Sequence, residues 1–127
     1  MSNASSQAWA FYREVAKKRI VWTICDDGGY PAPKTPEGQC AQPFWSSLYR
    51  VEQIIKNVPA YSGFRAVEIS WEDFCAKWAP ELTKNGYLVG VNWSGKRATG
   101  YDMEPKRLKQ YVDALIEDPG LRATSGK

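Results

Sequence analysis

The sequence predicts one α+β domain, with about four helices packed on a mixed sheet of roughly four to five strands. Three observations lead to this fold class. The 127 residues fit a single domain. Helical and β-type segments follow one another in the order α-β-β-α-β-α-β-β-α, without the strict alternation of a parallel sheet. Apolar residues make up 43% of the chain and include 6 Trp, 7 Tyr and 4 Phe, enough to fill a core.

The first helix is predicted from an apolar stripe that follows a serine N-cap, Ser5 or Ser6. Its members recur at the spacing of one helix face, at Ala8, Phe11, Tyr12, Val15 and Ala16. Residues 1–7 before it are expected to form a flexible tail. The β-branched and aromatic run of residues 20–25 then predicts the first strand.

A turn, a proline-rich loop and a second strand come next. Asp26 and Asp27 precede two glycines, which is the composition of a turn. The run of residues 40–44 is expected to be a strand with Pro43 at its end or at an edge, because proline cannot donate to a ladder. Ser46 or Ser47 then caps a helix that ends near residue 57.

The second half of the chain predicts two more helices and three more strands. A short strand is expected over residues 65–69, and Ser70 begins a capping box for a helix that Pro80 kinks or divides. A period-two strand runs from Tyr87 to Trp93, and the Ser94-Gly95 turn returns the chain as a hairpin.

The last helix is expected to open at Asp102 or Met103, with Pro105, a residue favoured at the first helical position, near its start. Its apolar stripe consists of Leu108, Tyr111, Val112, Leu115 and Ile116. A Pro-Gly pair at 119–120 ends it, and residues 119–127 are expected to form a flexible tail. The predicted domain therefore spans residues 8–118.

Composition excludes several function classes. The net charge of +3 comes from 17 basic and 14 acidic residues that are interspersed, which does not favour nucleic-acid binding. Three cysteines without a Cys-x-x-Cys pair, and no histidine, leave too few ligands for a zinc site, and we expect no cofactor. The odd cysteine count and the lack of a secretory signal or membrane-spanning run predict a cytoplasmic protein with no membrane contact.

No motif in the sequence predicts enzymatic chemistry. The run from Gly90 to Arg97 is close to a P-loop, but Arg97 stands where Ser or Thr must hold magnesium, and the run does not open a helix. Ser46, Ser47 and Cys40 are possible nucleophiles, yet without histidine the usual general base is absent. We therefore expect a protein that is not an enzyme.

The surplus of aromatic residues, with no catalytic constellation, predicts a protein-interaction module. Trp93 ends its strand beside two basic residues, and a second tryptophan stands at the junction of a strand and a helix. Exposed aromatics of this kind anchor protein partners. The predicted surface, for an unidentified partner protein or for self-association, consists of Trp45, Ser46, Trp93, Lys96 and Arg97.

Two alternatives stay open from the residues alone. Asp26 and Asp27 are positioned to bind a metal or small ligand, or to perform acid–base chemistry, if they converge in a cleft. A stacked base on Trp93, beside Lys96 and Arg97, would make the protein a weak binder of single-stranded nucleic acid.

Several of these packing and turn signatures resemble a small uncharacterised bacterial family, domain of unknown function 2750, over residues 8–117. The similar segments are Val21-Trp22, Asp27-Gly28, Pro43-Phe44-Trp45-Ser46, Ser70-Trp71-Glu72-Asp73-Phe74 with Trp78 and Leu82, and Gly86 with Val89-Gly90-Val91-Asn92-Trp93. The resemblance implies no catalytic residues. The layout of strand, Pro-aromatic pair and helix is also similar to small bacterial immunity and secretion-associated modules.

Overall fold

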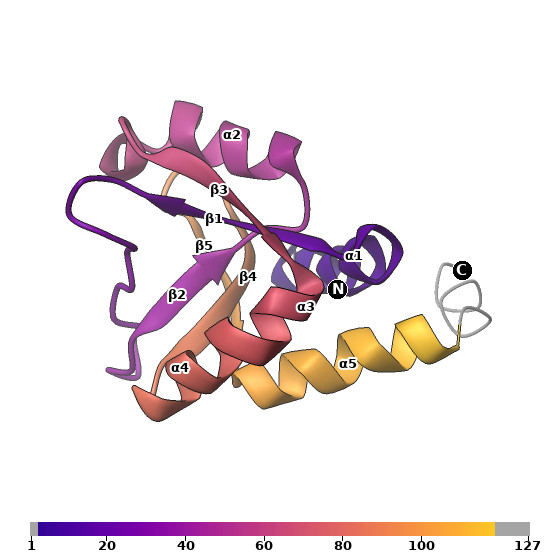
Figure 1. Ribbon diagram of the computed structural model, residues 1–127. Coiled ribbons are helices and arrows are strands. Elements are labelled where there is room, and N and C mark those ends of the chain that lie inside the picture. The colour runs from indigo at the N-terminus through magenta and orange to yellow at the C-terminus, as the bar shows by residue number, and fades with distance from the viewer. Residues whose placement is uncertain (1–2, 119–127) are drawn as a thin grey trace.

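A central three-stranded sheet separates two hydrophobic cores in this protein. Figure 1 shows the strands between α2 on one side and α5 on the other. The structure is a computed structural model that describes residues 3–118. Its elements are α1 (Asn3–Lys18), β1 (Ile20–Cys25), β2 (Ala41–Phe44), α2 (Leu48–Asn57), β3 (Arg65–Ser70), α3 (Trp71–Asp73), α4 (Ala79–Lys84), β4 (Leu88–Ser94), β5 (Thr99–Met103) and α5 (Pro105–Glu117). The predicted α+β class and the predicted order of elements are confirmed.

The five strands of the described chain form two sheets. In the first, β1 pairs with β3 in antiparallel fashion; in the second, β4 lies between parallel β2 and antiparallel β5. One bridge links them, through hydrogen bonds of 2.8 and 2.7 Å between the backbones of Trp22 and Trp45. The single mixed sheet that the sequence predicts is divided there because Pro43 has no N–H to donate toward β1. Its carbonyl oxygen instead accepts from Thr23 Oγ1 at 2.8 Å.

Side-chain alternation along β4 supplies both cores. Val89 and Val91 enter the core beneath α1 and α5, whereas Leu88 packs against the core beneath α2. A β-bulge follows, in which Asn92 adopts a left-handed backbone with φ 49°. The extra residue reverses the alternation, so Trp93 joins the α2 core rather than the Val91 face that its period-two spacing predicts.

Two serine caps and a π turn confirm or refine the predicted helix boundaries. The side chain of Ser47 accepts from the backbone N–H of Arg50, and that of Ser70 accepts from the N–H of Asp73. The helix that begins at α3 is not divided at Pro80. It continues into α4 through a π turn over Phe74–Trp78, in which the Ala79 N–H donates to the Phe74 carbonyl.

The N-terminal boundary of the predicted domain differs from the structure. Helix α1 begins at Asn3, inside the stretch of residues 1–7 that the sequence predicts as a tail. The predicted C-terminal tail, residues 119–127, lies outside the described residues. The final helix begins at Pro105, with Glu104 as its N-cap residue. The predicted start at Asp102 or Met103 is wrong, because these two residues pair with Gly90 and Val89 as the end of β5.

Candidate functional site

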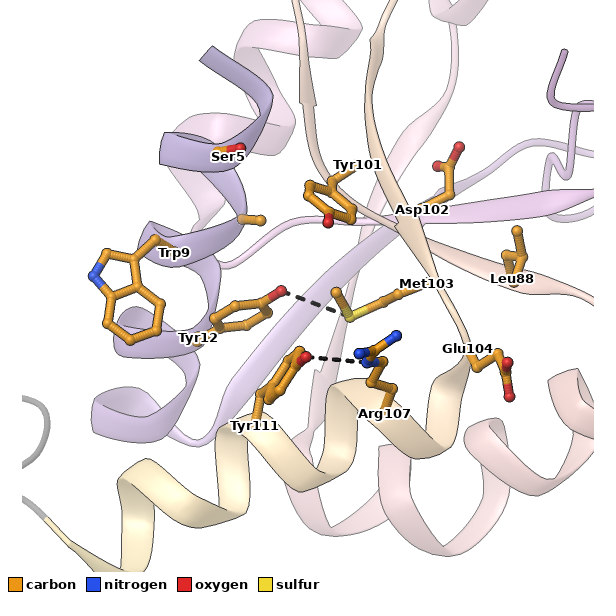
Figure 2. A pocket seen from close by; sticks show the side chains of 11 residues that line it. Ser5, Trp9, Tyr12, Leu88, Tyr101, Asp102, Met103, Glu104, Arg107 and Tyr111 are labelled. Carbon is orange, nitrogen blue, oxygen red and sulfur yellow. Dashed lines mark hydrogen bonds between the residues drawn. The ribbon is translucent and has the colours of Figure 1, made fainter. Parts of the chain in front are cut away.

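A groove with a volume of about 610 Å³ lies between α1, β5 and α5 (Figure 2). Aromatic and sulfur-containing side chains dominate its wall, with one arginine and two carboxylates. The lining residues are Ser5, Ala8, Trp9, Tyr12, Leu88, Tyr101, Asp102, Met103, Glu104, Arg107 and Tyr111. A volume of this size falls in the range of ligand-binding clefts.

We call this hollow the aromatic groove. The helical periodicity of α1 brings two of its rings, Trp9 and Tyr12, next to each other. Tyr12 belongs to the buried stripe of α1, and Trp9 stands one turn earlier, at the edge of that stripe. The centroids of these two rings are 5.8 Å apart, nearly perpendicular, and those of Tyr12 and Tyr111 are 5.2 Å apart. Both separations are favourable for aromatic pairs, so α1 and α5 are joined by a continuous row of rings.

Tyr12 forms the floor of the aromatic groove rather than a reactive group. Its hydroxyl donates to the sulfur of Met103 across 3.7 Å. Burial, together with the neighbouring hydroxyls of Tyr111 and Tyr101, raises the pKa of Tyr12 to about 12. The phenol therefore stays neutral at physiological pH, and it is a poor proton-transfer group there.

Arg107 is the charged group that faces the aromatic groove. Its Nε donates to the hydroxyl of Tyr111 at 3.0 Å, and its guanidinium carbon lies 5.8 Å from the centre of the Tyr111 ring. The hydrogen bond to Tyr111 raises the pKa of Arg107, which stays charged. Arg107 takes part in none of the ion pairs formed among residues 3–118. Its terminal nitrogens are thus available to an anion.

The two carboxylates of the lining are directed away from the rings. Figure 2 shows Asp102 and Glu104 on the far side of β5 from Tyr101 and Met103. Asp102 accepts from Trp93 Nε1 at 2.8 Å, and burial raises the pKa of its carboxyl group. The aromatic groove therefore combines apolar rings with an exposed cation.

The predicted interaction surface is not assembled as an exposed aromatic patch. Trp45 and Trp93 are 1% and 6% exposed, and the indole of Trp45 donates to the Trp93 carbonyl at 2.8 Å. Both rings pack in the α2 core, so their prediction as exposed anchors is wrong. They line a smaller cavity of about 310 Å³ with Lys96, while Arg97 is exposed in the hairpin turn.

Ser46, predicted as a helix cap or surface residue, is buried in a polar network between α1 and β4. Its hydroxyl donates to Glu14 at 2.5 Å and accepts from the Asn92 amide at 2.9 Å. Glu14 also accepts two hydrogen bonds of 3.1 Å from Arg50. A carboxylate held in this way is a weak base, so the pair does not form an activated nucleophile.

Glu14 makes the stability of the fold sensitive to acid. Burial raises the pKa of Glu14, but hydrogen bonds from Arg50 and Ser46 outweigh it, and the pKa lies below its ordinary value of about 4.5. Because the unfolded state binds the proton more readily, the stabilisation exists above that value and is lost as the pH falls through the folded pKa. We expect wild type and Glu14→Gln to differ in unfolding free energy at pH 7 and to converge in acid.

Urea denaturation at a series of pH values measures this difference. Glu52 is an exposed glutamate of α2, and Glu52→Gln serves as the matched control with a pH profile parallel to wild type. A difference between wild type and Glu14→Gln that stays constant down to about pH 3 would contradict the role given to Glu14.

The alternative acidic site is also corrected by the structure. The Asp26 carboxylate accepts from the N–H of Gly28 at 2.8 Å, closing the predicted turn. Asp27 projects into solvent and is 3.8 Å from Arg65. Among the described residues, no three Cys, Asp or Glu side chains gather closely enough to hold a metal ion. Asp26 and Asp27 therefore do not converge on a ligand site.

The sequence reasoning missed the residues that line the aromatic groove. Trp9 is off the main stripe of its helix, which was the one local signal. Tyr111 belongs to the predicted core stripe of the last helix, yet it is 39% exposed, and Tyr101 is 46% exposed. Nothing in their spacing links positions 9, 101, 107 and 111, because only the packing of α1 and α5 around β5 brings them together.

Comparisons with known proteins give a family but no activity. No curated protein matches the chain. A solved structure, Anabaena Tic22 (protein transport), is similar with a TM-score of 0.38 and 12% identity, over 70% of this chain and 45% of that chain. The chain thus spans less than half of the Tic22 chain, and this TM-score supports no inference. None of the helices found over residues 3–118 has the length and hydrophobicity of a membrane-spanning segment.

One family model covers most of the chain, from the first buried residue of α1 to the middle of α5. It matches residues 8–112 and is described as a protein of unknown function. The match includes the strands, the π turn and the residues of the aromatic groove from Ala8 onward. The chain therefore belongs to the family DUF2750.

Proposed function

We propose that this protein is a non-enzymatic interaction module that binds a segment of another protein in the aromatic groove. The single observation that carries the proposal is the exposure of Tyr101 and Tyr111 at one groove, beside Arg107, which forms no ion pair with any residue in the described part of the chain. Tyrosine and arginine are enriched among the residues that dominate binding energy at protein interfaces. Their clustering at one hollow is the pattern expected of an anchor site.

The position of the aromatic groove favours an extended polypeptide as its occupant. Strand β5 is the terminal strand of its sheet, and it forms one border of the groove. A terminal strand presents backbone groups to which a partner segment can add, while pockets beside it receive alternate side chains. The proposed module therefore needs no catalytic group and no bound cofactor.

The other roles considered from the sequence have less support. Stacking of a nucleic-acid base on Trp93 requires an accessible ring, and that ring is buried. An enzyme built on Asp26 and Asp27 requires carboxylates that converge. A role in immunity or secretion, in the cytoplasm of a bacterium, has only one supporting feature. That feature is the order of strand, Pro-aromatic pair and helix around Pro43–Trp45. A toxin-like gene beside the gene for this protein would favour this role.

Site-specific photocrosslinking tests the proposal. A benzophenone amino acid replaces Tyr101 or Tyr111 in the full chain, and the protein is irradiated in a lysate of its native host. We expect both positions to give the same discrete adduct, because both side chains border the aromatic groove. An adduct made of two copies of the chain would identify the partner as the protein itself.

Tyr30 provides a matched control, since it is a tyrosine with the same 46% exposure as Tyr101 and is not part of the groove. The benzophenone at position 30 should give none of the adduct. Equal labelling from positions 30, 101 and 111, or no adduct from positions 101 and 111, would count against the proposed function.

A further inference from the structure

The orientation of Arg107 shows which chemistry the aromatic groove is prepared to recognise. The bond from Nε to the Tyr111 hydroxyl and the contact with the Tyr111 ring hold the guanidinium at the groove. One edge of the guanidinium is thereby occupied, and the two terminal nitrogens are left for a ligand. A guanidinium held in this way is preorganised for a carboxylate, which it binds with two parallel hydrogen bonds.

The surrounding charges also favour an acidic ligand. The first turn of α5 contains Lys106 and Arg107 and no acidic residue. These two cations and the positive end of the helix dipole act in the same direction at this end of the groove. Asp102 is held by Trp93, and Glu104 is directed away from the rings (Figure 2), although the charge of Glu104 acts on Arg107.

The rings define the second part of the ligand. Tyr101 and Tyr111 are 46% and 39% exposed, and Figure 2 shows the side chain of Met103 beside the Tyr12 hydroxyl, with Tyr101 above it and Tyr111 below it. Methionine and tyrosine surfaces accept aromatic and large aliphatic groups. A carboxylate on Arg107 would stand next to such a group, because Arg107 is itself in contact with Tyr111.

We propose that the aromatic groove recognises an acidic segment of a partner protein, in which an aspartate or glutamate lies next to an aromatic or large aliphatic residue. Arg107 binds the carboxylate, and Tyr101, Tyr111 and Met103 receive the apolar side chain. This inference rests on the proposed function, since it names the chemistry of the partner at the same site. Charge complementarity selects this occupant over a basic or neutral one.

Selection from a random peptide library displayed on phage tests the inference with the full chain as bait. We expect the enriched peptides to contain Asp or Glu within a few positions of an aromatic or aliphatic residue. A representative peptide should bind at least about tenfold more tightly than its copy with Asn or Gln in place of the acid, the usual effect of one charge-assisted contact. Arg107→Gln should remove this difference between the two peptides.

Glu104→Gln is a control that should change the affinity in the opposite direction, because it removes a negative charge next to Arg107. This variant should bind the acidic peptide more tightly, whereas Tyr30→Ala should bind it as the wild type does. Enriched peptides without an acidic excess, or an acidic preference that persists in Arg107→Gln, would overturn the inference. If the enriched peptides show no acidic preference but bind more weakly to the double variant Tyr101→Ala/Tyr111→Ala, the proposed function is supported and only the acidic specificity is wrong. If the enriched peptides bind the wild type and all the groove variants equally well, both the inference and the proposed function are overturned.

Discussion

Gly90→Ala is expected to lower the free energy of unfolding by about 3 kcal/mol, the upper end of the usual range for overpacking. The indole of Trp93 lies directly over Gly90. A methyl group at position 90 would be 2.2 Å from Cε2 and 2.4 Å from Nε1 of that ring. The ring cannot move without cost, because Nε1 donates to Asp102 and the residue is buried in the α2 core. Urea denaturation measures the loss.

A double-mutant cycle separates this clash from a general intolerance of position 90. In a Trp93→Ala background the added methyl has no ring to meet, so Gly90→Ala should change stability by less than about 1 kcal/mol. Gly100→Ala is the graded control, since its methyl would lie 3.1 Å from Trp93 Cδ1, and a smaller loss is expected. Additive effects of the changes at positions 90 and 93 would contradict the proposed contact.

Asn92→Ala is expected to lower the free energy of unfolding by about 3 kcal/mol, for two reasons that act together. The side-chain oxygen of Asn92 accepts from the buried Ser46 N–H at 2.9 Å, and its amide donates to the carbonyl of Gln7 at 3.1 Å. Alanine leaves the Ser46 N–H without its acceptor. Alanine also adopts the left-handed backbone of the bulge less readily than asparagine does.

Asn92→Gly distinguishes the two reasons. Glycine loses the same hydrogen bonds but accepts φ 49° without strain, so it should be about 1 kcal/mol more stable than Asn92→Ala. Equal stability of the two variants would mean that the backbone of the bulge is unstrained. A wild-type stability for either variant would show that the network from Gln7 to Ser46 does not hold α1 against β4.

Local signals predicted the secondary structure well, because each depends on a few neighbouring residues. Ser47 and Ser70 cap helices as expected, and α2 ends at Asn57, two residues before a proline. Pro105 begins the last helix. Hydrogen bonds to a cap, the missing N–H of proline and the spacing of an apolar stripe all act within one or two turns of chain.

The face on which Trp93 lies could not be predicted in this way. Period-two reasoning assumes an uninterrupted strand, and a single left-handed residue at Asn92 reverses every side chain after it. Trp93 therefore lies over Gly90 instead of beside Val91, and a residue predicted as an exposed anchor becomes part of a core. Pro43 divides the sheet for a similarly non-local reason, since its effect depends on which strand its missing N–H faces.

By itself the sequence determined that this protein is one α+β domain with a surplus of rings, and that its helices begin and end where local chemistry requires. Only the tertiary structure decided which rings are buried and which meet in a groove. The reason is that Trp9, Tyr101, Arg107 and Tyr111 become neighbours through the packing of two helices against an edge strand, and no spacing along the chain records that packing.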